Sequence, residues 1–243
     1  MAVEIARQGA DVAVSGRRVE RLEETVALIE AQGRRGLAVP CDVSHEEDLD
    51  AAVDAVVQRF GRLDVAVANA GIGVTGRVER LTADDWRRLL DVNVVGVALT
   101  AARAIPHLRE TRGRLALVGS VSAWGLLPGY APYQASKAAV YVLGRTLALE
   151  LARDGISVTT VQPGFVASEI RRLDTDGRVD PGKADPVPPA LLWSAEDAAR
   201  VVVRAIHRRR LVFTFTGHGR ALHFLGRHLP GTSHRLAGLL SGR

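Results

Sequence analysis

Cysteine, long apolar runs and a leader-like N-terminus are scarce or absent in this chain of 243 residues. The single cysteine, Cys41, excludes an internal disulfide framework and a cysteine-rich zinc site, so a cytoplasmic location is expected. No run approaches the roughly 18 consecutive apolar residues of a transmembrane helix, and residues 1–12 lack the basic-then-apolar order of a signal peptide. With 47% hydrophobic and 24% charged residues, the composition excludes a disordered chain and allows one or two globular domains.

Acidic residues stop at Asp197, although nine arginines follow it. The whole chain has 32 basic and 27 acidic residues, a net charge of +5, whereas residues 1–197 hold 23 basic and 27 acidic residues, a net charge of −4. The positive charge therefore belongs to the C-terminal part, and the acidic body argues against nucleic acid as a partner. Lysine is scarce too, since Lys137 and Lys183 stand against 30 arginines.

Short apolar runs alternate with amphipathic stretches of helical length along most of the chain. This alternation is typical of a parallel sheet with helices on both faces, so the fold class that we expect is α/β, a doubly wound, Rossmann-like parallel sheet. Strands are expected at residues 11–15, 36–40, 63–68, 114–119, 157–162 and 211–216. Helices are expected at residues 18–32, 45–60, 82–110, 131–153 and 195–210.

Two of these helices begin with capping signals. Ser44 and Glu47 have the spacing of a capping box, and Thr82 with Asp85 is a weaker version of the same signal. Residues 174–190, by contrast, contain four prolines and interrupt the pattern. They form either a solvated excursion or, since they follow the carboxyl end of a strand, a lid over a ligand site, which is the interpretation that we favour.

The strongest chemical signal joins Ser120 to Tyr133 and Lys137 in the segment YQASK. Residues four apart share one face of a helix, so the Lys137 ammonium would lie near the Tyr133 phenol. A neighbouring ammonium favours the phenolate and lowers the tyrosine pKa from its usual value near 10, which suits general acid–base chemistry at a carbonyl or alcohol oxygen. Ser120 ends an apolar strand, where its hydroxyl could donate to a substrate.

Four further motifs accompany this set in a fixed order. Asp42-Val43 follows one strand, Asn69-Ala70-Gly71 closes the next, Asn93 lies in the long helix after it, and Pro163-Gly164 follows a later strand. With Ser120, Tyr133 and Lys137 these motifs resemble those of the short-chain dehydrogenase/reductase family over residues 1–170 at least. The resemblance implies a Rossmann-type sheet and hydride transfer between a nicotinamide cofactor and a carbonyl or alcohol.

The resemblance also implies a role for each catalytic residue. Tyr133 would be the acid/base, and Ser120 would hold the reacting oxygen, with Ser122 as the substitute if the loop register differs. Lys137 would bind the nicotinamide ribose and lower the Tyr133 pKa, and Asn93 would support a water in the proton relay. No metal ligands are expected.

The cofactor-binding residues follow in the same way. By resemblance, Asn69, Ala70 and Gly71 border the adenosine ribose, and Asp42 and Val43 contact the adenine. By the same resemblance, the nicotinamide is backed by Pro163, Gly164, Val166 and Ser168, the last standing where many members have threonine. After the strand at 11–15 come Arg17 and Arg18 without an acidic residue, and arginine can pair with a 2′-phosphate, so NADP(H) is favoured over NAD(H). The alternative is that both arginines simply begin a solvated helix.

The family's first strand and glycine-rich turn are not found in the sequence, which begins inside the expected first helix. In the strand order 3-2-1-4-5-6 that strand is central, and its loss would leave unpaired backbone edges in the middle of the sheet. Either the true start lies upstream, which we favour, or the chain is a degraded relative. As written, residues 1–243 are expected to bind a dinucleotide poorly and to fold poorly.

We expect a Rossmann-like domain over residues 1–217 and a basic amphipathic tail over 218–243. The tail packs on the domain, attaches to an anionic membrane surface, or makes an oligomer or lid contact. His218, His223 and His228 are spaced around a helix, so we interpret them as solvent or interface groups and not as metal ligands. The apolar stretches 86–105 and 134–152 suggest a homodimer or homotetramer.

The function predicted from the sequence is an NADP(H)-dependent oxidoreductase that reduces a ketone or aldehyde, or oxidises a secondary alcohol. The expected substrate is a largely apolar small molecule, because the candidate pocket residues are mainly apolar. These residues are Trp124, Leu126, Leu127, Tyr130 and Ile170. The alternative is a non-catalytic Rossmann-like scaffold or a peripheral membrane protein without dinucleotide binding.

Overall fold

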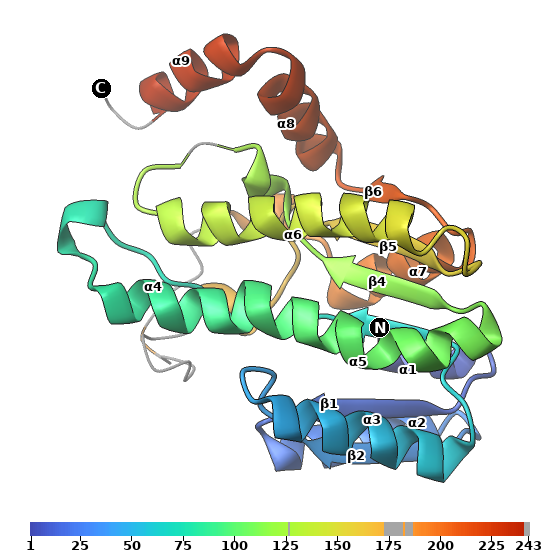
Figure 1. Ribbon diagram of the computed structural model, residues 1–243. Coiled ribbons are helices and arrows are strands. Elements are labelled where there is room, and N and C mark those ends of the chain that lie inside the picture. Colours follow the sequence, from blue (N-terminus) through green and yellow to red (C-terminus); the bar gives the residue numbers. More distant parts are fainter. Residues whose placement is uncertain (126, 173–181, 183–186, 241–243) are drawn as a thin grey trace.

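The computed structural model describes residues 1–125, 127–172, 182 and 187–240, which form strands alternating with helices (Figure 1). The strands are β1 (Val12–Gly16), β2 (Gly36–Pro40), β3 (Val65–Ala68), β4 (Arg114–Val118), β5 (Ser157–Gln162) and β6 (Val212–Thr214). The helices are α1 (Ala2–Arg7), α2 (Val19–Glu30), α3 (Glu46–Phe60), α4 (Ala83–Leu90), α5 (Gly96–Thr111), α6 (Ala131–Glu150), α7 (Ala195–His207), α8 (Gly217–His228) and α9 (Pro230–Leu240). Short turns are η1 (Val78–Arg80), η2 (Asp91–Val95), η3 (Val121–Ala123), η4 (Glu169–Arg172) and η5 (Pro189–Leu191).

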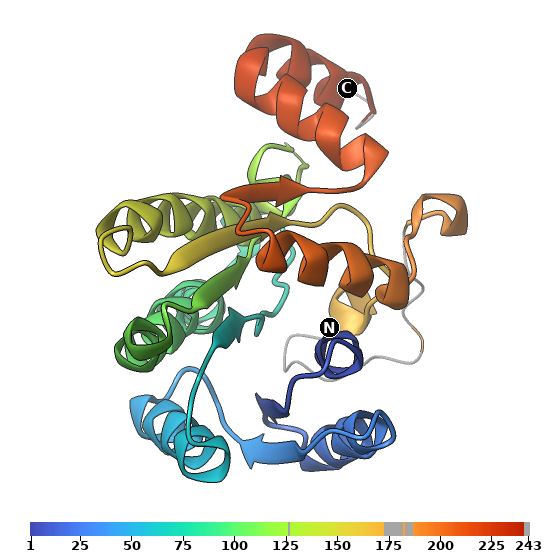
Figure 2. The same ribbon diagram turned by 90° about the vertical axis from the view of Figure 1, so that its right-hand side faces the viewer.

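All strand pairs are parallel, but they belong to two separate sheets. β1 pairs with β2, and β3, β4, β5 and β6 follow one another in the second sheet. In the part of the chain that the structure describes, no strand pairs with the other edge of β1 or of β3. Figure 2 shows β1 and β2 below β3, as a separate pair at the lower end of the row of strands.

Helices cover both faces of the four-stranded sheet, with α5 and α6 on one face and α7 on the other (Figure 2). Alternate residues of β4 explain this arrangement, because successive side chains of a strand point to opposite faces. Leu115 and Leu117 are fully buried in a cluster with α5 and α6, whereas Ala116 is buried against Val202 and Ile206 of α7. The predicted doubly wound α/β class is therefore confirmed.

Of the two predicted capping boxes, the one with the weaker sequence signal is the one that forms. Thr82 and Asp85 form a complete capping box at the start of α4. The prediction for Ser44 was wrong, since α3 begins after His45 and has no side-chain cap. The Ser44 amide (3.0 Å) and hydroxyl (2.7 Å) both donate to Asp42 Oδ1, so Ser44 belongs to the turn before the helix.

The helix expected at 82–110 is interrupted by a wider turn. Between α4 and α5, residues 91–95 form the π-helix η2. By length and composition the combined stretch Ala83–Thr111 is apolar enough to cross a membrane. Its apolar side is a core surface here, since Val97, Ala101 and Leu108 are buried against β3, β4 and β5.

Candidate active site

The predicted catalytic residues come from elements that meet at the carboxyl ends of β3, β4 and β5. Open α/β sheets bind ligands at this edge. Gly71 follows β3, Ser120 follows β4 and Gly164 follows β5. Helix α6 runs alongside and carries Tyr133 and Lys137 in its first two turns.

Lys137 is buried beside Tyr133, with 3% of its surface exposed. Its ammonium lies 5.6 Å from the centroid of the Tyr133 ring and donates to the Val118 carbonyl at the end of β4 (3.0 Å). Burial lowers the pKa of Lys137 from 10.5 to about 8, so the group is still mainly charged at neutral pH. A cation held at this place can stabilise negative charge on the phenol oxygen.

Asn93 is fully buried in the π-helix, a feature that is frequent at functional sites. Its Oδ1 accepts from the Ile72 amide (2.8 Å), and its Nδ2 donates to the Ile72 carbonyl (3.0 Å) and to Ser136 Oγ (3.1 Å). Ser136 Oγ in turn donates to the Tyr133 carbonyl (2.8 Å). This chain of bonds connects the segment after β3 to the start of α6.

Ser120 is held by two neighbours. Its backbone amide donates to Oε1 of the fully buried Gln162 (3.0 Å). Its hydroxyl oxygen accepts from the amide (3.1 Å) and the hydroxyl (2.8 Å) of Ser122. Because a hydroxyl has two acceptor lone pairs and one proton, this arrangement leaves the Ser120 proton to donate to a substrate oxygen.

Gly71 lies between the side chains of Asn93 and Lys137. A Cβ added to it would be 3.3 Å from Asn93 Oδ1 and 3.4 Å from Lys137 Nζ. The absence of a side chain therefore leaves open space beside both polar groups. Asn69 and Ala70, on the same turn, are exposed.

The predicted cofactor-selecting arginines are exposed and lie within reach of carboxylates. Arg17 Nη1 is 3.6 Å from Asp42 Oδ2, and Arg18 Nη1 donates to Glu169 Oε2 (2.8 Å). Burial alone would raise the pKa of Asp42, but hydrogen bonds from Ser44 and the nearby Arg17 charge lower it overall. The arginines at the end of β1 and the Asp42 turn after β2 thus lie together.

Val166 and Ser168, two of the remaining predicted residues, lie along the segment after β5. Val166 forms an isolated bridge with Trp193, and Ser168 is exposed. Val43 packs against Gly96, where an added Cβ would be 2.7 Å from Val43 Cγ2. Most of the predicted lid at 174–190, and Leu126, lie outside the described residues.

Two of the three histidines, interpreted above as solvent or interface groups, make contacts within the chain. His218 accepts a hydrogen bond from the Phe165 amide (3.1 Å), and the His223 ring stacks on Trp124, 5.1 Å between centroids. Both contacts join α8 to the body of the chain. His228 is exposed.

Sequence reasoning missed Gln162, Ser136 and His218. Gln162 had a signal, because a polar side chain ending an apolar strand is unusual inside a core. Ser136 and His218 had none, since Asn93, which donates to Ser136, and Phe165, which donates to His218, lie on elements distant in the sequence.

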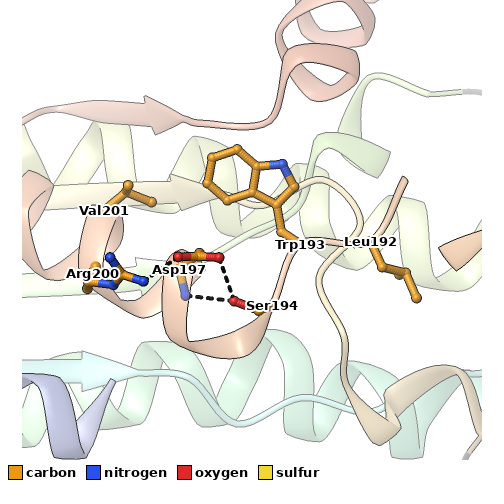
Figure 3. Close-up of a pocket in the computed structure, with 6 residues that line it drawn as sticks. All are labelled: Leu192, Trp193, Ser194, Asp197, Arg200 and Val201. Carbon is orange, nitrogen blue, oxygen red and sulfur yellow. Dashed lines mark hydrogen bonds and ion pairs between the residues drawn. The ribbon is translucent and has the colours of Figure 1, made fainter. Parts of the chain in front are cut away.

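A shallow pocket of about 420 Å³ lies elsewhere, at the start of α7 (Figure 3). It is lined by Leu192, Trp193, Ser194, Asp197, Arg200 and Val201. Its polar groups bind one another, since the Ser194 hydroxyl donates to Asp197 Oδ2 (2.8 Å) and Arg200 pairs with Asp197. None of the residues around Tyr133 contributes to it, so it is not the candidate active site.

A sequence model described as short chain dehydrogenase matches residues 1–178. This chain belongs to the short-chain dehydrogenase family. This short-chain dehydrogenase is 37% identical over 219 residues to 3beta-hydroxysteroid dehydrogenase 1 of Eggerthella lenta, and the match covers 83% of each chain. It is 35% identical over 222 residues to 11-beta-hydroxysteroid dehydrogenase A of Sesamum indicum, covering 86% of this chain and 62% of the relative.

Among solved structures, this short-chain dehydrogenase is similar to an alcohol dehydrogenase of the archaeon Thermococcus sibiricus complexed with 5-hydroxy-NADP. The TM-score is 0.76 at 27% identity, and the match covers 88% of this chain and 89% of that one. The family and the fold together make this chain an oxidoreductase that acts on small-molecule alcohols or carbonyl compounds.

Proposed function

We propose that this short-chain dehydrogenase is an NADP(H)-dependent oxidoreductase that interconverts a ketone or aldehyde and its alcohol, with Tyr133 as acid/base. The observation that carries the proposal is the buried Lys137 ammonium beside the Tyr133 ring. A buried charge is costly, and the fold retains it next to a phenol at the ligand-binding edge of the sheet.

Each residue has a role that its contacts support. Ser120 donates its hydroxyl proton to the reacting oxygen, while Tyr133 gives a proton to that oxygen or takes one from it. The Lys137 charge stabilises the phenolate form of Tyr133. Asn93 already uses both of its N–H protons within the protein, so its Oδ1 is the atom that would accept a bond from a relay water.

The residues at the two ends of the site fit a dinucleotide. Val118 O is the one hydrogen-bond acceptor of Lys137 among the described residues, so two ammonium protons remain for ribose hydroxyls. Bound NADPH would supply the hydride for the reduction. The described residues contain no glycine-rich turn between a strand and a helix to hold the pyrophosphate. A fluorescence titration with NADPH tests the proposed cofactor, and the absence of any binding would contradict it.

The proposed preference for NADP(H) over NAD(H) rests on Arg17 and Arg18, which follow β1. The NADP derivative bound to the Thermococcus sibiricus relative supports this preference. Replacing both arginines by glutamine is expected to raise the KM for NADPH and leave that for NADH nearly unchanged. Equal effects on both cofactors would contradict a role for these arginines in selecting the 2′-phosphate.

The substrate that we propose is a largely apolar secondary alcohol or its ketone. Two relatives are named as hydroxysteroid dehydrogenases, which supports a bulky apolar compound. A panel of steroid, aliphatic and polyol substrates, followed by cofactor absorbance at millimolar NADPH or NADP, tests this. Turnover restricted to polyols would overturn it.

The decisive test of the chemistry is Tyr133→Phe. It is expected to lower kcat by at least about 100-fold, the contribution of a positioned general acid, while leaving NADPH binding intact. Ser120→Ala and Ser122→Ala form a matched pair, in which only the first is expected to have a comparably large effect. Full activity of the Tyr133→Phe variant would refute the assignment.

We also propose a cytoplasmic homodimer or homotetramer. Val142 and Leu149 of α6 are 61% and 81% exposed, which suits an interface between copies. The domain over 1–217 and the tail over 218–243 remain part of this proposal; for the tail we favour packing on the domain, which the contacts of His218 and His223 support, with a membrane surface or an oligomer or lid contact as the alternatives. Light scattering with a Leu149→Glu variant tests the assembly, and a monomeric wild type would contradict it.

A further inference from the structure

His218 lies in the first turn of α8 and contacts the turn that follows β5. Its Nε2 accepts a hydrogen bond from the Phe165 amide (3.1 Å). The two rings stack with 5.0 Å between centroids and 22° between planes. A Cβ added to Gly164 would lie 2.5 Å from the same nitrogen, so the backbone approaches this closely only because residue 164 is glycine.

The first turn of α8 is itself fixed by the residue that precedes it, Thr216. Thr216, which is fully buried, caps the helix by accepting a hydrogen bond from the Gly219 amide (3.1 Å). The same hydroxyl lies directly against Gly164. The backbone that carries His218 is therefore fixed by the capped first turn of α8.

This contact reaches the reacting groups through one further bond. The Pro163 carbonyl accepts from the Val121 amide (3.0 Å), the residue next to Ser120. The turn 163–166 is thus connected to His218 on one side and to the Ser120 segment on the other. Movement of that turn would disturb both the nicotinamide end of the site and the Ser120 hydroxyl.

We propose that His218 is a positioning residue, whose unprotonated Nε2 holds the Phe165 amide and fixes the turn Pro163–Val166 for the nicotinamide end of the cofactor. This inference rests on the proposed function. An imidazole nitrogen can accept only when it carries no proton, so protonation of His218 removes the bond and leaves the Phe165 amide without its acceptor.

The surroundings of His218 favour the unprotonated form. Helix α8 packs against η3, β6 and α9. η3, β6 and the turn 163–166 carry no titratable side chain, and the titratable groups of α8 and α9 are Arg220, His223, Arg227, His228, His234 and Arg235. None of these is an acid that could pair with an imidazolium, and burial lowers the pKa of His218 below its usual 6.5.

The test compares His218→Gln with His218→Leu. The Gln Oε1 can take the place of Nε2 as an acceptor but does not titrate, whereas leucine cannot accept. We expect His218→Leu to lower kcat/KM for NADPH by about 10-fold to 100-fold, the effect of a small misplacement in a site. His218→Gln should keep most of the wild-type activity at about pH 8. Between about pH 8 and about pH 5 it should lose a smaller fraction of its activity than the wild type loses. His228→Leu, on the exposed part of the same helix, is the matched control.

Amide hydrogen exchange at Phe165 supplies a readout that does not depend on turnover. The amide is expected to be protected in the wild type and in His218→Gln, and unprotected in His218→Leu. An unchanged kcat/KM in His218→Leu, or an acid loss in His218→Gln equal to that of the wild type, would overturn the inference. If the wild type turns over no substrate, the proposed function fails, and equal Phe165 exchange in all variants then refutes the His218 contact separately.

Discussion

Lys137 gives the sharpest prediction, because the residue that we propose for the chemistry should lower the stability of the fold. Burial lowers its pKa from 10.5 to about 8, and at ~1.36 kcal/mol per pH unit this difference corresponds to about 3 kcal/mol of lost stability. Lys137→Met removes the buried charge and also the hydrogen bond to Val118 O, worth ~1 kcal/mol. The variant should therefore be more stable than the wild type at pH 7 by about 2 kcal/mol, while losing turnover.

The pH dependence has a definite sign. Between about 8 and 10.5 the unfolded chain keeps the Lys137 proton that the folded chain has lost, so the stability of the wild type rises with pH across this window. The advantage of Lys137→Met should be complete below about pH 8; above 10.5 only the loss of the hydrogen bond remains, so the variant should be less stable than the wild type by ~1 kcal/mol. Urea unfolding of both proteins at neutral and alkaline pH measures it.

Arg153→Met is the matched control, since Arg153 is exposed and has no ion pair among the described residues. It should change the free energy of unfolding by less than about 0.5 kcal/mol at either pH. A Lys137→Met protein that is less stable than the wild type at pH 7, or whose advantage is independent of pH, would refute this reasoning.

Three further predictions concern the fold. Leu115→Ala, at a fully buried position, should lower the free energy of unfolding by roughly 2–5 kcal/mol in denaturant titration, and a loss under 1 kcal/mol would argue against this core. Thr82→Ala should cost about 1 kcal/mol through loss of the α4 cap, whereas Ser44→Ala should leave α3 uncapped as before, and equal losses would contradict the assignment. In a parallel pair every second backbone amide of a strand points to the same neighbouring strand, so the Val14 amide points to β2 and the Ser15 amide points away from it. Amide hydrogen exchange measured by NMR should therefore be faster at Ser15 than at Val14. Equal protection of the two amides would show that the other edge of β1 is paired.

The strands could be predicted because their apolar runs are short and separated by helix-length segments. β2 and β5 have the predicted bounds, and the others differ by one or two residues at an end. The π-helix η2 could not be foreseen, because residues 91–95 have the apolar pattern of an ordinary helix. What distinguishes them is the Asn93 side chain bonded to Ile72, a contact across 21 positions.

The candidate site was predictable only where a motif has a fixed spacing. Tyr133 and Lys137 share a helix, so their proximity follows from the sequence alone. The partners of Ser120 divide in the same way: Ser122 lies two positions on, but Gln162 comes from the neighbouring strand. The anchoring of α8 by His223 against Trp124 also needs the fold, because 99 positions separate the two rings.

The division of the strands into two sheets has a consequence for the order in which the parts of the molecule unfold. Residues 1–60 hold two small clusters of buried residues, around Ile29 and around Leu49, and these are distinct from the cluster around Leu115. The two parts meet through contacts between helices, α1 with α7 and α3 with α5, and not through strand hydrogen bonds. Cooperativity in a sheet passes along its ladder, so the N-terminal part should behave as a foldon that melts before the rest. The proposed adenosine end of the site would then be lost while Tyr133 and Lys137 remain in place.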